Sequence, residues 1–183
     1  MTDLSLYILD ITMNSVRAGA KNIEVKLEEI NKVLTVTITD DGCGMTAEQV
    51  EKLSNPFFTT RTTRKVGLGI PFLRLLAEQT GGRVDIESKS EKEFEDHGTT
   101  VTAVFHSDHI DFVPLGDLCE TMITLVQGSP DIDFVYSHTS DDGTAVGMDT
   151  REMRAILGDD IPLNSYEILE FIRGFLKDQY AQN

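Results

Sequence analysis

The chain of 183 residues is long enough for one domain of ordinary size, or for one domain with a substantial appendage. Its 40% content of hydrophobic residues supports a core. No apolar run approaches the roughly 18 residues of a membrane span, and the first residues lack the basic and then apolar pattern of a secretion signal. The formal net charge of −15 repels phosphate backbones. We therefore expect a cytoplasmic protein that binds neither nucleic acid nor a membrane.

The charged residues are unevenly distributed along the chain. Residues 1–106 carry 16 acidic and 12 basic residues, whereas residues 107–183 carry 15 acidic and 4 basic ones. We predict a domain over residues 1–106, followed by an acidic extension or small subdomain over residues 107–183. Two cysteines, Cys43 and Cys119, have no companions at metal-ligand spacing, and we interpret them as small packed residues.

Hydrophobic periodicity predicts the elements of the first part. Apolar residues three and four apart indicate a first helix, and alternation interrupted at Asn31-Lys32 indicates a hairpin. Thr46, with Gln49 three residues later, is typical of a capping box at the start of a short helix. The other predicted ranges are a helix over 3–18, strands over 22–29 and 33–39, a loop over 54–66, a helix over 67–79, and strands over 84–88 and 99–105.

The second part is predicted to contain four elements. Its pattern favours a helix over residues 115–126 and an amphipathic helix over residues 166–179. Between them, strands over 133–137 and 144–148 would form a hairpin around Asp141-Asp142-Gly143.

Three polar side chains share one face of the first predicted helix. Asp10, Asn14 and Arg17 stand at positions i, i+4 and i+7. The amide oxygen of Asn14 suits magnesium, which prefers oxygen ligands and bridges nucleotide phosphates, and Asp10 could orient or deprotonate an attacking hydroxyl or water. Arg17 could meet a phosphate. An ordinary solvent-facing helix surface is the alternative interpretation.

A second motif follows the predicted hairpin. Asp40 comes at the end of a strand and is followed by Asp41-Gly42-Cys43-Gly44. A carboxylate at this place can accept a hydrogen bond from the exocyclic amine of adenine, and Gly42 and Gly44 let a ring approach the backbone closely. A tight Asp-Gly turn without a ligand is the alternative.

A third motif, Gly67-Leu68-Gly69, directly precedes a helical stretch. Its amide hydrogens and the positive end of the helix dipole can therefore face phosphate oxygens. Arg61, Arg64 and Lys65 lie just upstream, where cations can meet a polyphosphate, although a solvated basic loop has the same composition. Together the motifs predict a pocket for a magnesium nucleotide.

In this order and spacing, the segments over about residues 3–105 resemble the nucleotide-binding boxes of the GHKL superfamily. That superfamily comprises gyrase, the heat-shock chaperone ATPases, histidine kinases and the mismatch-repair protein MutL. The resemblance implies an α/β fold, a two-layer sandwich with a mixed, mostly antiparallel sheet, here with a C-terminal α+β extension. It also implies ATP or ADP with Mg²⁺ as ligands.

The resemblance assigns roles to particular positions. It makes Asn14 the magnesium ligand and places Asp10 in the general-base position, where related hydrolases and serine kinases usually have Glu and histidine kinases an amide. Lys65 replaces the first glycine of the usual G-x-G-x-G. The remaining positions implied at the nucleotide are Asp40, Gly42 and Gly44 of the adenine box, Phe58, Thr59 and Thr60 of the phenylalanine box, the neighbouring Arg64, then Gly67, Leu68 and Gly69 of the second glycine box, and Thr99 and Thr100 beside the adenine.

The leading hypothesis is a stand-alone, histidine-kinase-like signalling kinase or ATPase that binds Mg-ATP and acts on an unknown partner protein. That partner would carry any phosphoacceptor. One alternative is a MutL-like ATP-driven conformational clamp, favoured by Asn14-Ser15. The other is a non-catalytic nucleotide-sensing module. The sequence leaves these functions and the oligomeric state open.

Overall fold

A computed structural model describes residues 3–54, 69–158 and 160–182. The first part of the chain contributes α1 (Leu4–Arg17), β1 (Asn22–Ile30), β2 (Val33–Asp40), α2 (Ala47–Ser54), α3 (Gly69–Gln79), β3 (Arg83–Lys89) and β4 (Gly98–His106). These elements confirm the predicted order. The turn between β1 and β2 has positive φ at Asn31 and Lys32, which is the geometry that a two-residue hairpin loop requires.

The second part contributes α4 (Leu118–Gly128), β5 (Asp133–Ser140), β6 (Ala145–Asp149), α5 (Thr150–Leu157) and α6 (Tyr166–Ala181). The predicted start of the first of these helices at residue 115 is wrong by three residues. Gly116 has a φ of +79°, which is not helical, and the Asp117 carboxylate accepts a hydrogen bond from the Glu120 N–H as the N-cap. The helix therefore begins only at Leu118.

Helix α5 was not predicted, because it follows β6 with no intervening loop. The Asp149 carboxylate caps it by accepting a hydrogen bond from the Arg151 N–H, and Gly158 ends it with a φ of +75°. Asp149 thus both ends β6 and caps α5. An Asp followed by Glu152 three residues later was the local signal that could have revealed it.

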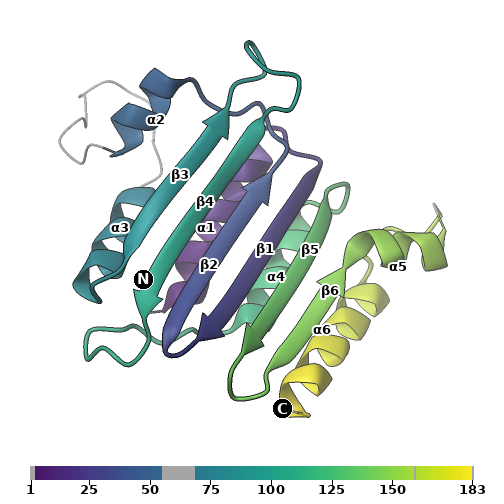
Figure 1. The fold of residues 1–183 in the computed structure, drawn as a ribbon. Coiled ribbons are helices and arrows are strands. Elements are labelled where there is room, and N and C mark those ends of the chain that lie inside the picture. Colours follow the sequence, from purple (N-terminus) through teal and green to yellow (C-terminus); the bar gives the residue numbers. More distant parts are fainter. Residues whose placement is uncertain (1–2, 55–68, 159, 183) are drawn as a thin grey trace.

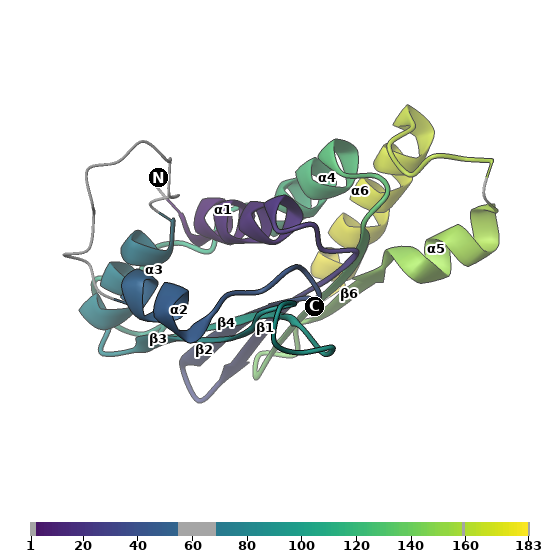
Figure 2. The same ribbon diagram turned by 90° about the horizontal axis from the view of Figure 1, so that it is seen from above.

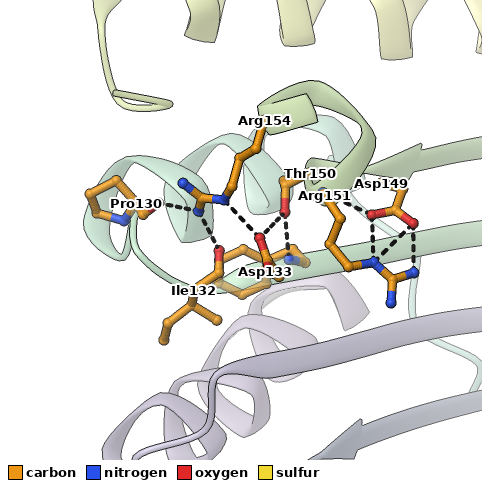
Figure 3. A network of polar contacts seen from close by, with 8 residues as sticks. Pro130, Ile132, Asp133, Asp149, Thr150, Arg151 and Arg154 are labelled. Carbon is orange, nitrogen blue, oxygen red and sulfur yellow. Dashed lines mark hydrogen bonds and ion pairs between the residues drawn. The ribbon is translucent and has the colours of Figure 1, made fainter. Parts of the chain in front are cut away.

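Polar contacts fasten α5 to the start of β5 (Figure 3). The Phe134 N–H donates to Thr150 Oγ1 at 2.8 Å, and Arg154 Nε donates to Asp133 Oδ1 at 2.8 Å. Arg154 also donates to the backbone carbonyls of Pro130 and Ile132. The position of α5 is therefore set by side chains that bond the first residues of β5 and the backbone just before it.

The strands form one sheet in the order β3-β4-β2-β1-β5-β6. Neighbours run antiparallel except β1 and β5, which are parallel. Helices α1, α3, α4 and α6 cover one face of this sheet (Figures 1 and 2). The predicted α/β class with a mixed, mostly antiparallel sheet is confirmed.

The core lies between the sheet and these helices. In β2 the apolar Leu34, Val36 and Ile38 are buried and alternate with threonines on the open face. Phe134 and Tyr136 of β5 belong to the same buried cluster as the first part of the chain. Strands β5 and β6 thus extend the sheet that β1 to β4 begin, and the boundary between residues 106 and 107 stays a prediction. Within the described ranges, no helix is long and apolar enough to span a bilayer.

Candidate functional site

A cavity of about 370 Å³ lies between α1, α2, the start of α3 and the ends of β2 and β4. Its wall combines apolar side chains with a few polar groups, as ligand pockets do. The lining residues are Ile11, Asn14, Ser15, Ala18, Asp40, Cys43, Gly44, Met45, Gln49, Leu53, Ile70, Thr99 and Val101. Four of the residues predicted from the sequence, Asn14, Asp40, Gly44 and Thr99, are therefore in this wall.

Asp40 is held in place by hydrogen bonds to both of its carboxylate oxygens. Ser15 Oγ donates to Oδ2 at 2.5 Å, and the Gly42 N–H donates to Oδ1 at 2.9 Å. Ser15 is buried in α1, so this bond joins the helix to the end of β2. Each carboxylate oxygen can accept a further hydrogen bond, so an amine donor in the cavity could still bind to Asp40.

The next residue, Asp41, anchors the turn from the other side. Its carboxylate accepts hydrogen bonds from the backbone N–H groups of Lys21 and Asn22 at 2.7 and 2.9 Å and from Asn22 Nδ2 at 2.7 Å. Burial raises the pKa of Asp41, but the bonds from Asn22 and Lys21 outweigh it and leave this pKa below its ordinary value. Asp41 therefore has a structural role, which leaves Asp40 to face the cavity.

The glycines of the turn are required by close packing. A Cβ at Gly44, where φ is +63°, would lie 1.8 Å from the carbonyl oxygen of Lys89, and a Cβ at Gly42 would lie 2.9 Å from the Cβ of Ala18. The Gly42 carbonyl also contacts His97 Nδ1 at 2.6 Å. These contacts hold the turn against α1 and the loop between β3 and β4.

The three polar residues on α1 differ in their surroundings. Asn14 lines the cavity, and its Oδ1 accepts a hydrogen bond from Arg17 Nη1 at 3.0 Å. Asp10 lies outside the cavity lining, beside the first residue of α3: a Cβ built on Gly69 would be 2.1 Å from Asp10 Oδ2. The structure thus brings the first and third motifs together through Asp10 and Gly69.

Thr99 and Thr100 point to opposite faces of the sheet, as successive strand residues must. Thr99 lines the cavity and its Oγ1 lies 2.8 Å from Ser88 Oγ. Thr100 Oγ1 donates to Thr39 Oγ1 at 3.3 Å on the open face. Only Thr99 is therefore placed to meet a ligand in the cavity.

Several predicted positions lie outside the described residues. They are Phe58, Thr59, Thr60, Arg64, Lys65, Gly67 and Leu68.

The sequence motifs did not predict every residue of the cavity wall, and Ser15 is the most informative of those that were missed. Its position four residues after Ile11 and directly after Asn14 was the available signal, because Ile11, Ser15 and Ala18 share the helix face beside Asn14.

Residues 2–109 match the family described as the histidine kinase-, DNA gyrase B- and HSP90-like ATPases. The match covers more than half of the chain, so the chain belongs to this family. It has a GHKL-type ATP-binding domain like that of histidine kinases, as the sequence motifs predicted.

The curated relatives include sensor histidine kinases and a sporulation kinase. The chain is 34% identical over 88 residues to the sensor histidine kinase ZraS of Klebsiella oxytoca, covering 46% of this chain and 19% of ZraS. It is 29% identical over 110 residues to sporulation kinase B of Bacillus subtilis, covering 58% of this chain and 24% of that kinase. The chain therefore spans about a fifth to a quarter of the length of these relatives.

Solved structures share the fold over a longer stretch. The Aquifex aeolicus MutL ATPase domain complexed with ADP matches with a TM-score of 0.55 and 14% identity, covering 95% of this chain and 88% of that one. The N-terminal domain of a DNA repair protein matches with a TM-score of 0.54 and 16% identity, covering 87% of this chain and 58% of that one. The likeness in fold thus includes much of residues 107–183.

Proposed function

We propose that this chain binds Mg-ATP and acts as a histidine-kinase-like signalling kinase or ATPase on a partner protein in the cytoplasm. The observation that carries the proposal is the Asp40 carboxylate, held by Ser15 and Gly42 in the wall of the cavity. A carboxylate fixed in this way can accept a hydrogen bond from the exocyclic amine of adenine. The apolar Met45 and Leu53 nearby could pack against the purine ring.

Asn14 is the proposed magnesium ligand. Its Oδ1 is an amide oxygen at the cavity wall, which fits the preference of Mg²⁺ for oxygen donors. Among the described residues there is no cluster of three or more acidic, His or Cys side chains that could hold a metal. We propose that a Mg²⁺ ion here takes its other ligands from nucleotide phosphates and water, and that it neutralises phosphate charge. Arg17, already bonded to Asn14, is proposed to meet a phosphate.

Asp10 is the proposed general base. It lies one helical turn before Asn14 and next to Gly69 at the start of α3, where the helix dipole favours phosphate. From there its carboxylate could accept a proton from an attacking water or hydroxyl. Gly67 and Leu68, with the basic and aromatic residues upstream, are proposed to contact the phosphates. Thr100 is proposed only as a support for β2.

A MutL-like conformational clamp is the second candidate, and the fold shared over 95% of the chain favours it. Incubation with γ-labelled ATP, with and without candidate partner proteins, separates a kinase from a clamp or ATPase and both from a nucleotide sensor. A kinase gives labelled partner, a clamp or ATPase gives free phosphate, and a nucleotide sensor gives neither.

The binding step is tested by thermal and chemical unfolding. A ligand that binds only the native state at a hundredfold excess over its dissociation constant stabilises it by about 2.7 kcal/mol. We expect such a shift with Mg-ATP and a smaller one with ATP plus a chelator. Absence of any shift at millimolar nucleotide, in folded protein free of carried-over ligand, would refute the proposal.

A further inference from the structure

A second hollow lies far from the nucleotide cavity, at the outer edge of β6. It has a volume of about 390 Å³ and is walled by helices α5 and α6, which diverge from this edge of the sheet (Figure 1). We call it the α5–α6 groove. Its lining residues are Val135, Tyr136, Gly147, Met148, Asp149, Glu152, Met153, Ile156, Phe171 and Phe175.

The walls of the α5–α6 groove expose large apolar side chains. Ile156 is 84% exposed, Phe171 61% and Phe175 41%. The two phenylalanine rings stack in parallel with their centroids 6.1 Å apart. The half-buried Met153 adds flexible, polarisable surface of the kind found at peptide-binding sites, whereas Met148 is buried beneath the groove. Contiguous exposed apolar surface of this sort marks an interaction site.

The edge of β6 is closed to strand addition at its centre. Gln179 of α6 accepts a hydrogen bond from the Gly147 N–H at 2.9 Å and donates one to the Gly147 carbonyl at 3.0 Å. An incoming strand would need the same two backbone groups. The occupant of the groove is therefore not a strand, and two helical walls favour a helix that inserts apolar side chains between them.

The charges around the α5–α6 groove are negative. Asp149 and Glu152 line it, and Glu167 and Asp178 lie on the α6 face that carries the two phenylalanines, four residues before the first and three after the second. A cationic partner would therefore be attracted to the rim.

The basic side chains of residues 107–183 offset only part of this charge, because each of the four is paired with an acid and only Arg151 pairs with an acid that lines the groove. Arg151 pairs with Asp149 and Arg154 with Asp133, as Figure 3 shows, while Arg173 and Lys177 pair with Glu120. Glu152 and Glu167 have no ion pair within the described part of the chain.

We propose that the α5–α6 groove binds an amphipathic, basic helix of another protein. Leucine or similar residues at helical spacing would fill the space between Ile156 and Phe171, and Lys or Arg residues beside them would meet Glu152 and Glu167. A second copy of this chain is a poor occupant, because two molecules of net charge −15 repel each other.

The test uses two synthetic amphipathic peptides of about 18 residues with the same leucine pattern, one with Lys and the other with Glu at the polar positions. Binding of each labelled peptide to the full chain is measured by fluorescence anisotropy at low and high salt. We expect the Lys peptide to bind, the Glu peptide to bind at least tenfold more weakly, and salt to weaken the Lys complex.

Ile156→Ser and Phe171→Ser should each lower the affinity for the Lys peptide by about tenfold, since a few large apolar side chains carry much of the binding energy of an interface. The combined Glu152→Lys and Glu167→Lys change should do the same. Ile110→Ser is the matched control, because Ile110 is 94% exposed and lies outside the groove. It should leave binding unchanged.

Three outcomes would overturn the proposal. The first is equal binding of the two peptides, and the second is binding of the Lys peptide that depends on salt but not on Ile156 or Phe171. The third is a monomer–dimer equilibrium in sedimentation that Ile156→Ser abolishes, which would assign the groove to a second copy of the chain.

Discussion

Ser15 of α1 donates a hydrogen bond to the Asp40 carboxylate at the end of β2, over a distance of 2.5 Å and a separation of 25 residues. The bond is largely shielded from water, because Ser15 is 5% exposed. The helix that carries Asn14 and the carboxylate proposed to read adenine are therefore fixed relative to each other.

The first prediction concerns this bond. Ser15→Ala removes the donor to Asp40 and should weaken ATP binding by about 1 kcal/mol, roughly fivefold, because the carboxylate is then less well oriented. Ser5→Ala is the matched control, since Ser5 Oγ donates to Asp3 at 2.6 Å on the same helix but away from the cavity. Calorimetric titration with ATP should separate the two variants. Equal affinities would exclude a positioning role for Ser15.

The second prediction separates the metal site from the adenine site. Asn14→Ala should abolish the magnesium dependence of nucleotide binding, because it removes the proposed ligand. Asp40→Asn should reduce the preference for ATP over GTP by roughly tenfold, since it replaces an acceptor of the adenine amine with an amide. Each variant is titrated with both nucleotides, with and without Mg²⁺. Small and identical effects of the two changes would mean that both motifs are only structural turns.

The third prediction concerns the chemical step. Asp10→Asn should leave ATP affinity nearly unchanged and lower turnover by roughly a hundredfold or more, as expected for a positioned general base. If the reaction is transfer to a histidine, whose nitrogen needs less help from a base, the change should affect transfer little. Turnover at saturating ATP is the measurement. An unchanged rate would remove Asp10 from the chemical mechanism.

The fourth prediction uses the contact between Gly69 and Asp10. A Cβ at position 69 would lie 2.1 Å from Asp10 Oδ2, so Gly69→Ala must displace that carboxylate and should lower turnover at least tenfold. Gly174→Ala in the middle of α6 is the control, because a Cβ at position 174 would meet nothing within 4 Å. That change should instead stabilise the protein by about 1 kcal/mol in urea unfolding. Full activity of Gly69→Ala would show that the position of Asp10 does not matter.

The fifth prediction concerns pH and the attachment of α6. His138 on β5 is 5% exposed, and its Nδ1 lies 2.8 Å from the hydroxyl of Tyr180 at the end of α6. Burial lowers the pKa of His138 below 6.5, although the charges of Asp142 and Glu29 oppose this. The unfolded chain therefore binds a proton more readily than the native one, and stability falls as the pH drops below about 6.5 toward the native pKa.

Urea unfolding between about pH 7.5 and 5 measures this effect. His138→Gln should remove the part of the pH slope that arises from this residue. His109→Gln should keep it, since His109 is exposed. A His138 variant with the slope of the unchanged protein would show that the histidine is not buried in its neutral form.

The sequence by itself determined the local elements and the identity of the nucleotide motifs. Spacing of apolar residues predicted α1, the β1–β2 hairpin and α6, because helical and strand periodicity are properties of neighbouring residues. The placement of Asn14 and Asp40 in the cavity wall also agrees with the sequence motifs, since each occupies a defined place on a helix face or at a strand end. Close packing explains why positions 42 and 44, in the turn after β2, are glycines.

Only the tertiary structure decided how distant segments meet. Contacts between residues far apart in the chain determine the parallel pairing of β5 with β1, the bond from Ser15 to Asp40 and the position of α5. Such contacts produce no periodic pattern in the sequence. The choice between Thr99 and Thr100 has the same origin. Alternation places them on opposite faces, but the pairing of Thr99 with Asp40 across β4 and β2 determines which one faces the cavity.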